Sequence, residues 1–150
     1  EARASGVDGV LVVDLPPEES VPQNKILTLN GIRQIFLIAP NSSEDRIKKV
    51  GELAAGFIYY VSVKGVTGDK SISTSNIRKS LELVRNGTRL PIGLGFGIKT
   101  PESAREAAKL SDAVVVGSAL VDIIEKETEV NAARKALESF VKELKGAVDA

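Results

Sequence analysis

Three glycine-rich segments carry the residue types that bind a phosphate group through the backbone. They are residues 63–70 (VKGVTGDK), residues 93–99 (GLGFGIK) and the pair Gly117-Ser118. Glycine allows backbone N–H groups to approach a ligand closely, and a helix beginning at this pair would direct free N–H groups and a hydroxyl at an anion. Each segment also has a purely structural explanation, in turn formation, tight strand packing or helix capping. Their combination predicts a phosphate site, with the first segment as a mobile lid.

The composition limits which other chemistry is available. The chain of 150 residues has no cysteine and no histidine, which excludes disulfides, Cys-based zinc sites and catalysis by histidine. Lys plus Arg equals Asp plus Glu at 20 each, and the aromatic residues are 4 Phe and 2 Tyr. This balance argues against nucleic-acid binding. Because no apolar run approaches the roughly 20 residues that span a bilayer, and no signal-like start is visible, we expect a cytoplasmic protein.

The glycine-rich segments must be positioned by strands and helices that alternate along the chain. Short apolar runs predict strands at 9–14, 34–38, 57–61, 92–96 and 113–117. Capping residues predict helix starts at Ser42 or Ser43, at Ser75 or Asn76, and at Thr100. A short helix is expected at 119–125, and after it a last helix whose apolar face runs from Ala133 to Leu144.

This alternation predicts an α/β protein with a parallel sheet, either open and doubly wound or part of an eight-stranded barrel. Periodicity alone does not separate the two. In both, ligands bind at the loops that follow the carboxyl ends of strands, where the glycine-rich segments lie. The loop after the first strand, residues 14–20 (DLPPEES), has no glycine, which argues against a Rossmann fold. Residues 1–6 read as the tail of a helix ending at Gly6, so we expect that the beginning of the domain is missing.

The same segments resemble those of the tryptophan synthase alpha family. Residues 6–20 (GVDGVLVVDLPPEES) are similar to the fourth strand of that family and its following loop, and residues 62–68 (SVKGVTG) to its loop 6 motif. Residues 95–98 (GFGI) resemble the segment after strand seven, and residues 117–121 (GSALV) the segment after strand eight. Order and spacing agree along essentially the whole chain. The resemblance implies the C-terminal five βα units of a (β/α)8 TIM barrel, with parallel strands and outer helices, as a single partial-barrel domain over 1–150.

The resemblance also implies a function and a set of residues. The family enzyme is a carbon–carbon lyase of tryptophan biosynthesis, which splits indole-3-glycerol phosphate into indole and glyceraldehyde 3-phosphate. It needs no cofactor itself and passes indole to a pyridoxal-phosphate-dependent beta subunit. By motif, the substrate phosphate would be bound by Gly68, Gly97, Gly117 and Ser118. The substrate pocket and lid would include Tyr59, Thr67 and Phe96, and the face toward the beta subunit would include Asp14, Leu15 and Pro16.

The sequence departs from the family in its catalytic acids. The family places a glutamate on the second strand and an aspartate on the loop after it, and both would precede Glu1. Asp14 is expected to end the first strand in a structural or interface role. The remaining loop charges are expected to be solvated: Glu18, Glu19, Asp69 and Lys99, with Lys64 and Lys70 adding positive potential.

The chain alone is therefore predicted to be inactive as a lyase and to need the N-terminal half of the barrel as a partner. Two alternatives stay open. One is a catalytically inactive phosphate-binding half-barrel, natural or engineered, which dimerises to cover its exposed strand edges. The other is a different phosphate-binding barrel enzyme, against which the GVTG and DLPPEES segments argue.

Overall fold

The computed structural model describes residues 1–62, 74–95 and 97–150. Every expected strand is confirmed, within a few residues at its ends. The strands are β1 (Gly9–Leu11), β2 (Arg33–Ile38), β3 (Ile58–Val61), β4 (Ile92–Gly95) and β5 (Ala113–Val115).

The largest difference concerns the end of the first strand. The sequence predicts that Asp14 ends this strand, but β1 ends at Leu11 and Asp14 lies in the turn beyond it. The backbone N–H of Leu15 donates to the carbonyl of Val12 at 3.4 Å, which turns the chain away from the sheet. The proline that follows, Pro16, lacks an N–H group and so could not have continued the ladder.

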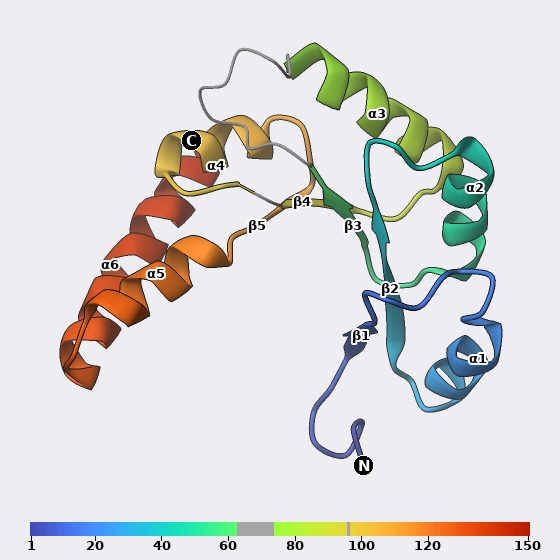
Figure 1. Cartoon of the computed structure of the whole chain (residues 1–150), viewed down its shortest axis with the longest axis horizontal. Coiled ribbons are helices and arrows are strands. Elements are labelled where there is room, and N and C mark those ends of the chain that lie inside the picture. The colour runs from blue at the N-terminus through green and yellow to red at the C-terminus, as the bar shows by residue number, and fades with distance from the viewer. Residues whose placement is uncertain (63–73, 96) are drawn as a thin grey trace.

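The order of the strands decides between the two expected closures. The strands pair in parallel in the order β1-β2-β3-β4-β5, which is also their order in the chain. Right-handed crossovers that always advance in one direction place every connecting helix on the same face of the sheet. A doubly wound sheet instead reverses direction at a switch point and carries helices on both faces. The sheet is therefore a segment of barrel wall, and Figure 1 shows the helices arranged as an arc around its outside.

Six helices are present in the described ranges, and most of their ends agree with the sequence signals. They are α1 (Val21–Leu29), α2 (Glu44–Leu53), α3 (Thr74–Gly87), α4 (Pro101–Ala108), α5 (Ser118–Lys126) and α6 (Val130–Val148). Ser43 caps α2, since its hydroxyl accepts a hydrogen bond from the N–H of Arg46 at 3.3 Å. Thr100 and Ser103 form a capping box at the start of α4. The expected start of α3 at Ser75 or Asn76 is slightly wrong, because this helix begins at Thr74.

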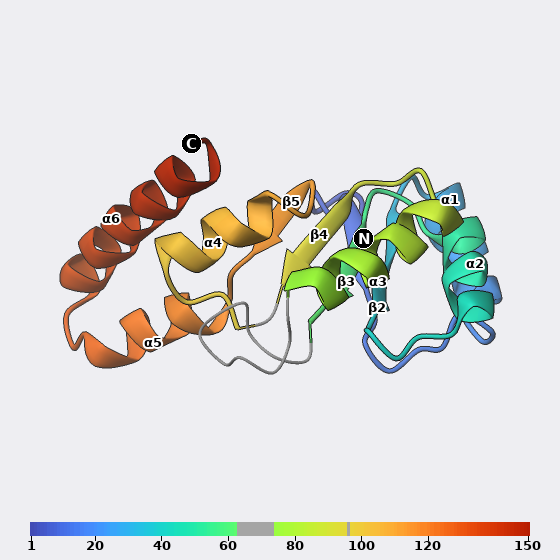
Figure 2. The same cartoon turned by 90° about the horizontal axis from the view of Figure 1, so that it is seen from above.

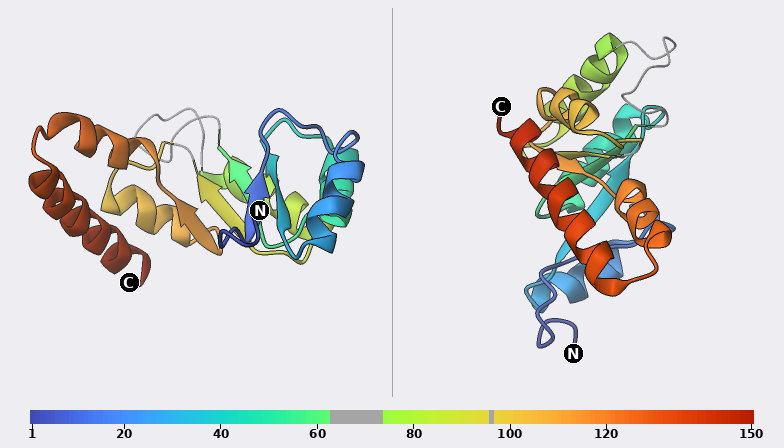
Figure 3. Two further views of the ribbon diagram at one scale, coloured as in Figure 1. Left: turned by 90° about the horizontal axis from the view of Figure 1, so that it is seen from below. Right: turned by 90° about the vertical axis from the view of Figure 1, so that its left-hand side faces the viewer.

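The hydrophobic core lies between the sheet and the outer helices. Alternate residues of the central strands point into it: Phe36 and Ile38 of β2, Ile58 and Tyr60 of β3, and Ile92 and Leu94 of β4 are all at most 4% exposed. They pack against the inward faces of the helices, which contribute Ile47, Val50, Ile77, Leu81, Val84, Ala104, Ala107 and Leu144. Figure 3 shows this layering from two further directions, with α6 as the last helix of the outer layer.

Glycine permits an unusually close contact between α2 and α3. A Cβ atom built on Gly51 would collide with the carbonyl oxygen of Gly87, and one built on Gly87 would lie 2.7 Å from Cγ2 of Ile47. Neither position has room for a side chain, so these two residues bring the ends of the helices together.

The opposite face of the sheet is apolar and only partly covered. Leu11, Ile35, Leu37, Val61 and Val115 lie along the strands at alternate positions to the core residues and are half-buried. Within the part of the chain that the structure describes, β1 pairs only with β2, and β5 only with β4. The sheet therefore has two open edges as well as an open face.

The first residues carry the hydrogen bonds of a helix C-terminus at Gly6, as expected, because the N–H of Gly6 donates to the carbonyl of Arg3 and that of Val7 to the carbonyl of Ala2, both at 3.1 Å. Residues 2–6 form turns, in which the N–H of Ser5 also donates to the carbonyls of Glu1 and Ala2. Gly6 has a φ of 87°, a left-handed conformation that glycine adopts without steric cost. Among the residues that the structure describes, no helix combines the length and the apolar character needed to cross a membrane.

Candidate phosphate-binding site

A pocket of about 560 Å³ opens where β3, β4 and β5 end and α5 begins. Its described lining consists of Tyr59, Gly97, Ile98, Lys99, Val115, Gly117 and Ser118. Figure 2 shows α5 on the side of the molecule where these strands end. Four residues predicted from three separate segments of the sequence (Tyr59, Gly97 and the pair Gly117-Ser118) are thus brought to one cavity.

Among the described residues, none accepts a hydrogen bond from the first two N–H groups of α5 at this pocket. Gly117 is the N-cap residue and provides no side chain to cap the helix, while its carbonyl accepts from the N–H groups of Leu120 and Val121 at 2.9 and 3.2 Å. The first N–H groups of a helix have no partner within the helix, and the helix dipole places partial positive charge there. The Ser118 hydroxyl is exposed at the same place. This arrangement is suited to an anion with several oxygen atoms.

The neighbouring α4 differs from α5 in this respect. The Thr100 hydroxyl accepts from the N–H of Ser103 at 3.2 Å, and the Ser103 hydroxyl accepts from the N–H groups of Lys99 and Thr100 at 3.2 and 3.0 Å. The N-terminus of α4 is thus satisfied by its own side chains. Counting partners among the described residues alone, the start of α4 is capped and the start of α5 has donors available for a ligand.

Gly97 carries the loop from β4 around the pocket. Its φ is 73°, which residues with a side chain rarely adopt, so glycine is required at this turn. The next residue, Ile98, is 2% exposed and anchors the loop in the core. Burial of Ile98 therefore fixes the backbone at this edge of the pocket. Gly97, next to it, presents no side chain to the cavity.

The glycines inside β4 have a different role, which is packing. A Cβ atom on Gly93 would lie 3.2 Å from Cδ2 of Phe57, and one on Gly95 would lie 2.5 Å from the hydroxyl oxygen of Tyr59. The same atom on Gly95 would lie 3.2 Å from Cβ of Val115. At these two positions the glycines are therefore explained by tight packing between strands, as one of the two interpretations of the sequence predicted. Gly95 makes room for Tyr59 and Val115, which both line the pocket.

Several of the predicted residues lie elsewhere or outside the described ranges. Gly68, Thr67 and Phe96, and the loop charges Lys64, Asp69 and Lys70, lie outside the residues that the structure describes. Asp14 is exposed, and Leu15 and Pro16 are half-buried, in the segment after β1.

The segment that follows is anchored in the core rather than in the pocket. Ser20 is fully buried and donates its hydroxyl hydrogen bond to the carbonyl of Pro17 at 2.8 Å. Glu18 and Glu19 are exposed, as expected.

The structure adds three residues to the pocket that the sequence did not assign to it. Ile98 and Val115 could have been inferred from their places beside Gly97 and on the face of β5 that carries no core residue. Lys99 was expected to be a solvated loop charge, and it is exposed, but it also lines the pocket. It is the one residue with a formal charge in the described lining.

Carboxylates are absent from the described lining of the pocket. The nearest acid along the chain, Glu102 in the first turn of α4, has its pKa lowered by a hydrogen bond to its own backbone N–H and by one from Thr100. That carboxylate is therefore engaged at the start of its own helix. No group of three or more potential metal ligands of the types His, Cys, Asp and Glu occurs among the described residues.

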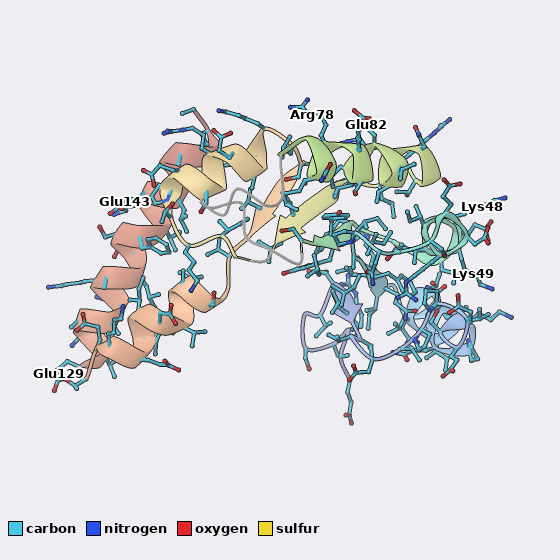
Figure 4. All side chains as sticks on the ribbon, turned by 45° about the horizontal axis from the view of Figure 1, so that its top comes forward. Lys48, Lys49, Arg78, Glu82, Glu129 and Glu143 are labelled. Carbon is cyan, nitrogen blue, oxygen red and sulfur yellow. The ribbon has the colours of Figure 1, made fainter. Side chains whose placement is uncertain are left out.

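A larger groove, of about 680 Å³, lies on the outer surface between α2 and α3. It is lined by Glu44, Ile47, Lys48, Gly51, Glu52, Leu83, Asn86 and Gly87. Figure 4 shows the charged side chains of these helices, among them Lys48, Lys49, Arg78 and Glu82, extending outward into solvent. Because barrel ligands bind at the carboxyl ends of the strands rather than between outer helices, we assign the site to the smaller pocket.

The family model described as "Tryptophan synthase alpha chain" matches residues 1–149. The chain is 51% identical over 148 residues to the tryptophan synthase alpha chain of Neisseria meningitidis serogroup B, covering 99% of this chain and 56% of that protein. It is 46% identical over 149 residues to that of Burkholderia multivorans, covering 99% and 55%. The chain thus spans about half the length of the curated relatives that it matches.

Solved structures give the same result. The tryptophan synthase alpha subunit of Legionella pneumophila has a TM-score of 0.85 at 31% identity, with 99% of this chain and 54% of that chain covered. A chain from the tryptophan synthase α2β2 complex of Pyrococcus furiosus has a TM-score of 0.83 at 36% identity, with 97% and 58% covered. Five parallel strands with outer helices, over about half of each barrel, correspond to a partial TIM barrel. By sequence over nearly its whole length, and by fold, this chain belongs to the tryptophan synthase alpha chain family.

Proposed function

We propose that these residues form the phosphate-binding part of a lyase in tryptophan biosynthesis, which cleaves indole-3-glycerol phosphate to indole and glyceraldehyde 3-phosphate. The observation that carries the proposal is the pocket at the uncapped N-terminus of α5, which unites Gly97, Gly117 and Ser118 with Tyr59. Family membership supports the choice of substrate.

Each pocket residue has a definite role in this proposal. Gly97 and Gly117 leave space for the phosphate, which accepts hydrogen bonds from the first N–H groups of α5 and from the Ser118 hydroxyl. Tyr59 lies beside Gly95 in the pocket lining and packs against the indole ring. Thr67, Gly68 and Phe96, which lie outside the described residues, complete the phosphate site and its lid.

The chemistry of cleavage requires groups that the described lining does not supply. Breaking the carbon–carbon bond requires a proton to reach the indole ring and another to leave a glycerol hydroxyl. Positioned acids and bases contribute roughly 10²–10⁴-fold each to such steps. We assign these roles to two carboxylates of the N-terminal βα units, while the present residues bind and orient the substrate.

The proposal includes the remaining assembly. Residues 1–150 act as a single partial-barrel domain, whose open face and edges are covered by the N-terminal half of the barrel. The turn at Asp14, Leu15 and Pro16 faces the beta subunit in this proposal, and the α2β2 complex among the related structures supports a partner of that kind. The alpha chain itself uses no cofactor, and the assembly is cytoplasmic.

A second candidate function is an inactive phosphate-binding half-barrel. The specific observation in its favour is the open sheet, together with a described pocket lining that has donors but no carboxylate. Both functions share the phosphate site, and they differ in whether an N-terminal half supplies the acids.

The two candidates are separated by activity and mass measured on the same sample. We expect the polypeptide of 150 residues to release no indole from indole-3-glycerol phosphate. We expect turnover from a family-length chain, meaning an alpha chain in which these residues follow the N-terminal βα units. Turnover by a sample whose intact mass equals that of the 150 residues would contradict the assignment of catalysis to upstream acids.

The phosphate site is tested by Ser118→Ala in the family-length chain. Loss of a hydrogen bond to a charged group costs about 1.5–3 kcal/mol, so the KM for indole-3-glycerol phosphate should rise about tenfold or more. Ser139→Ala is the matched control, because Ser139 is exposed on α6, away from the pocket lining, and its hydroxyl donates to the Glu143 side chain. Equal KM values for the two variants would remove Ser118 from the site.

A further inference from the structure

Lys99 is the residue of the pocket whose role the preceding proposal does not explain. It lines the cavity together with Gly97, Gly117 and Ser118, and among the described lining residues it alone has a formal charge. The donors that these neighbours offer are neutral backbone and hydroxyl groups. The charge of a phosphate dianion bound by these donors would be offset only by the partial positive charge at the start of α5, which is less than one full charge.

The backbone of Lys99 is held in place on both sides. Its N–H donates to the Ser103 hydroxyl at 3.2 Å, within the capping box of α4. The preceding Ile98 is 2% exposed and buried in the core. The backbone from which the Lys99 side chain extends is therefore fixed beside the pocket. The flexible four-carbon stem still leaves the ammonium group free to reach a ligand.

No carboxylate of the described residues competes for this ammonium. The ion pairs within the described ranges are those of Arg3, Arg85, Lys109, Lys142 and Lys145, and none involves Lys99. Glu102, three residues along the chain, is directed at its own helix N-terminus and at Thr100. The charge of Lys99 is thus available to an anion in the pocket.

We propose that Lys99 pairs with the phosphate dianion of the substrate and is a binding determinant in addition to the backbone amides and Ser118. This inference rests on the proposed phosphate site and adds to it a charged contact. An ammonium acts as a mobile point charge rather than a planar fork, so it strengthens binding without fixing the orientation of the phosphate. It contributes equally to ground state and transition state, because the phosphate does not react.

The experiment compares Lys99→Ala, Lys99→Arg and Lys109→Ala in the family-length chain. Lys109 is the control because its removal changes the net charge equally, and because it pairs with Glu106 at the far end of α4. An exposed charge pair is worth up to about 1 kcal/mol, so Lys99→Ala should raise the KM for indole-3-glycerol phosphate about fivefold. The value of kcat should stay unchanged, and Lys99→Arg should keep the KM within about twofold of the starting value.

Inorganic phosphate as a competitive inhibitor provides a second readout. Its inhibition constant should rise in parallel for Lys99→Ala, and the difference from the unsubstituted chain should shrink in about 0.5 M salt, which screens the ammonium. A KM and an inhibition constant equal to those of Lys109→Ala would overturn the role of Lys99. A lower kcat with an unchanged KM would also overturn it, since that pattern indicates a disturbed loop. If inorganic phosphate does not inhibit the unsubstituted chain at all, the proposed phosphate site itself fails.

Discussion

At the scale of single residues, the pocket depends on positions where a side chain is absent. Gly95 is the clearest case, because a Cβ atom there would lie 2.5 Å from the Tyr59 hydroxyl oxygen and 2.9 Å from Cζ of the same ring. The glycine thereby determines where the tyrosine lies. A neighbour forced to move by about 1 Å in a substrate pocket can cost up to about 100-fold in rate.

Substitution of Gly95→Ala should therefore damage both stability and activity of the family-length chain. We expect the free energy of unfolding to fall by about 1–3 kcal/mol, because an added methyl group overpacks the site. We expect kcat/KM for indole release to fall about tenfold or more. Chemical denaturation and steady-state kinetics measure the two effects.

The control for this substitution is Gly146→Ala in α6, where a Cβ atom would meet nothing within 4 Å. It should stabilise the helix by about 0.5–1 kcal/mol and leave kcat/KM unchanged. Combining Gly95→Ala with Tyr59→Ala should reduce the cost of the glycine substitution, since the ring that it displaces is gone. Simple additivity of the two substitutions would show that Tyr59 is not what Gly95 accommodates.

Tyr60, the neighbour of Tyr59 on the core side of β3, should make the free energy of unfolding depend on pH in the alkaline range. Burial raises the pKa of its hydroxyl above the ordinary 10.0, against a smaller opposing contribution from a hydrogen bond with Ser80. Because the folded pKa lies above the unfolded one, this contribution to stability is fully present below about pH 10. It is lost as the pH rises through the folded pKa.

Tyr60→Phe removes this titration and so tests it. The free energy of unfolding should fall less steeply above about pH 10 in the variant than in the unsubstituted chain, when both are followed by urea denaturation. Below that pH the variant should differ only by the lost hydrogen bond to Ser80, about 1 kcal/mol. Parallel pH profiles for the two chains would contradict the effect of burial.

At the scale of secondary-structure elements, the two helices beside the pocket differ in how their first N–H groups are satisfied. In α4 the Thr100–Ser103 capping box uses the chain's own hydroxyls, whereas α5 has no side-chain cap. Helix starts without a cap cost stability unless a ligand or water takes the place of the cap. The contrast indicates a structural role for the start of α4 and supports the proposed phosphate-binding role of the start of α5.

Ser103→Ala tests the structural role of the start of α4. Ser103 is 3% exposed, and its hydroxyl accepts from two backbone N–H groups and donates to the carbonyl of Thr100 at 2.8 Å. We expect a loss of about 1–2 kcal/mol in the free energy of unfolding, measured by denaturation of the family-length chain. Ser139→Ala, on the exposed face of α6, should change stability by less than about 0.5 kcal/mol. An equal effect of both substitutions would mean that the capping box does not stabilise α4.

At the scale of the whole molecule, the fold has a closed core between the sheet and its outer helices, and an open inner face on the other side of the sheet. The core between sheet and helices is closed, but the inner face presents Leu11, Ile35, Leu37, Val61 and Val115 half-buried, and Val13 is 67% exposed. Apolar surface of this kind, flanked by two strand edges, favours association.

Mixing the polypeptide of 150 residues with a separately made N-terminal half of the barrel should therefore have two effects. The fluorescence of a dye that binds exposed apolar surface should fall, because the inner face becomes covered. Under the proposed function, release of indole from indole-3-glycerol phosphate should begin, because the proposed upstream acids would meet the proposed phosphate site. An N-terminal half with both catalytic acids replaced should produce the first effect without the second. Indole release with that doubly substituted half would place the catalytic groups in the present residues.

The sequence by itself determined the five strands, five of the six described helices and the glycine-rich segments at the pocket, but it did not indicate α1. Continuous apolar runs and capping residues depend on local physics, and they placed all five strands and the capping residues Ser43 and Thr100. The glycine-rich segments at Gly97 and Gly117 were recognisable because backbone approach to an anion needs these residue types locally. The turn that ends β1 early was missed, because the end of a strand depends on pairing with a neighbour.

The tertiary structure alone decided the rest, because it depends on contacts between residues far apart in the chain. Strand order distinguished a barrel wall from a doubly wound sheet, which periodicity leaves undetermined. The roles of the three glycines from Gly93 to Gly97 separated only when their neighbours were known: Gly93 and Gly95 accommodate side chains, and Gly97 adopts a left-handed turn. Lys99 reads as a solvated charge in sequence and becomes a pocket residue only because the start of α5, from the end of another strand, folds beside it.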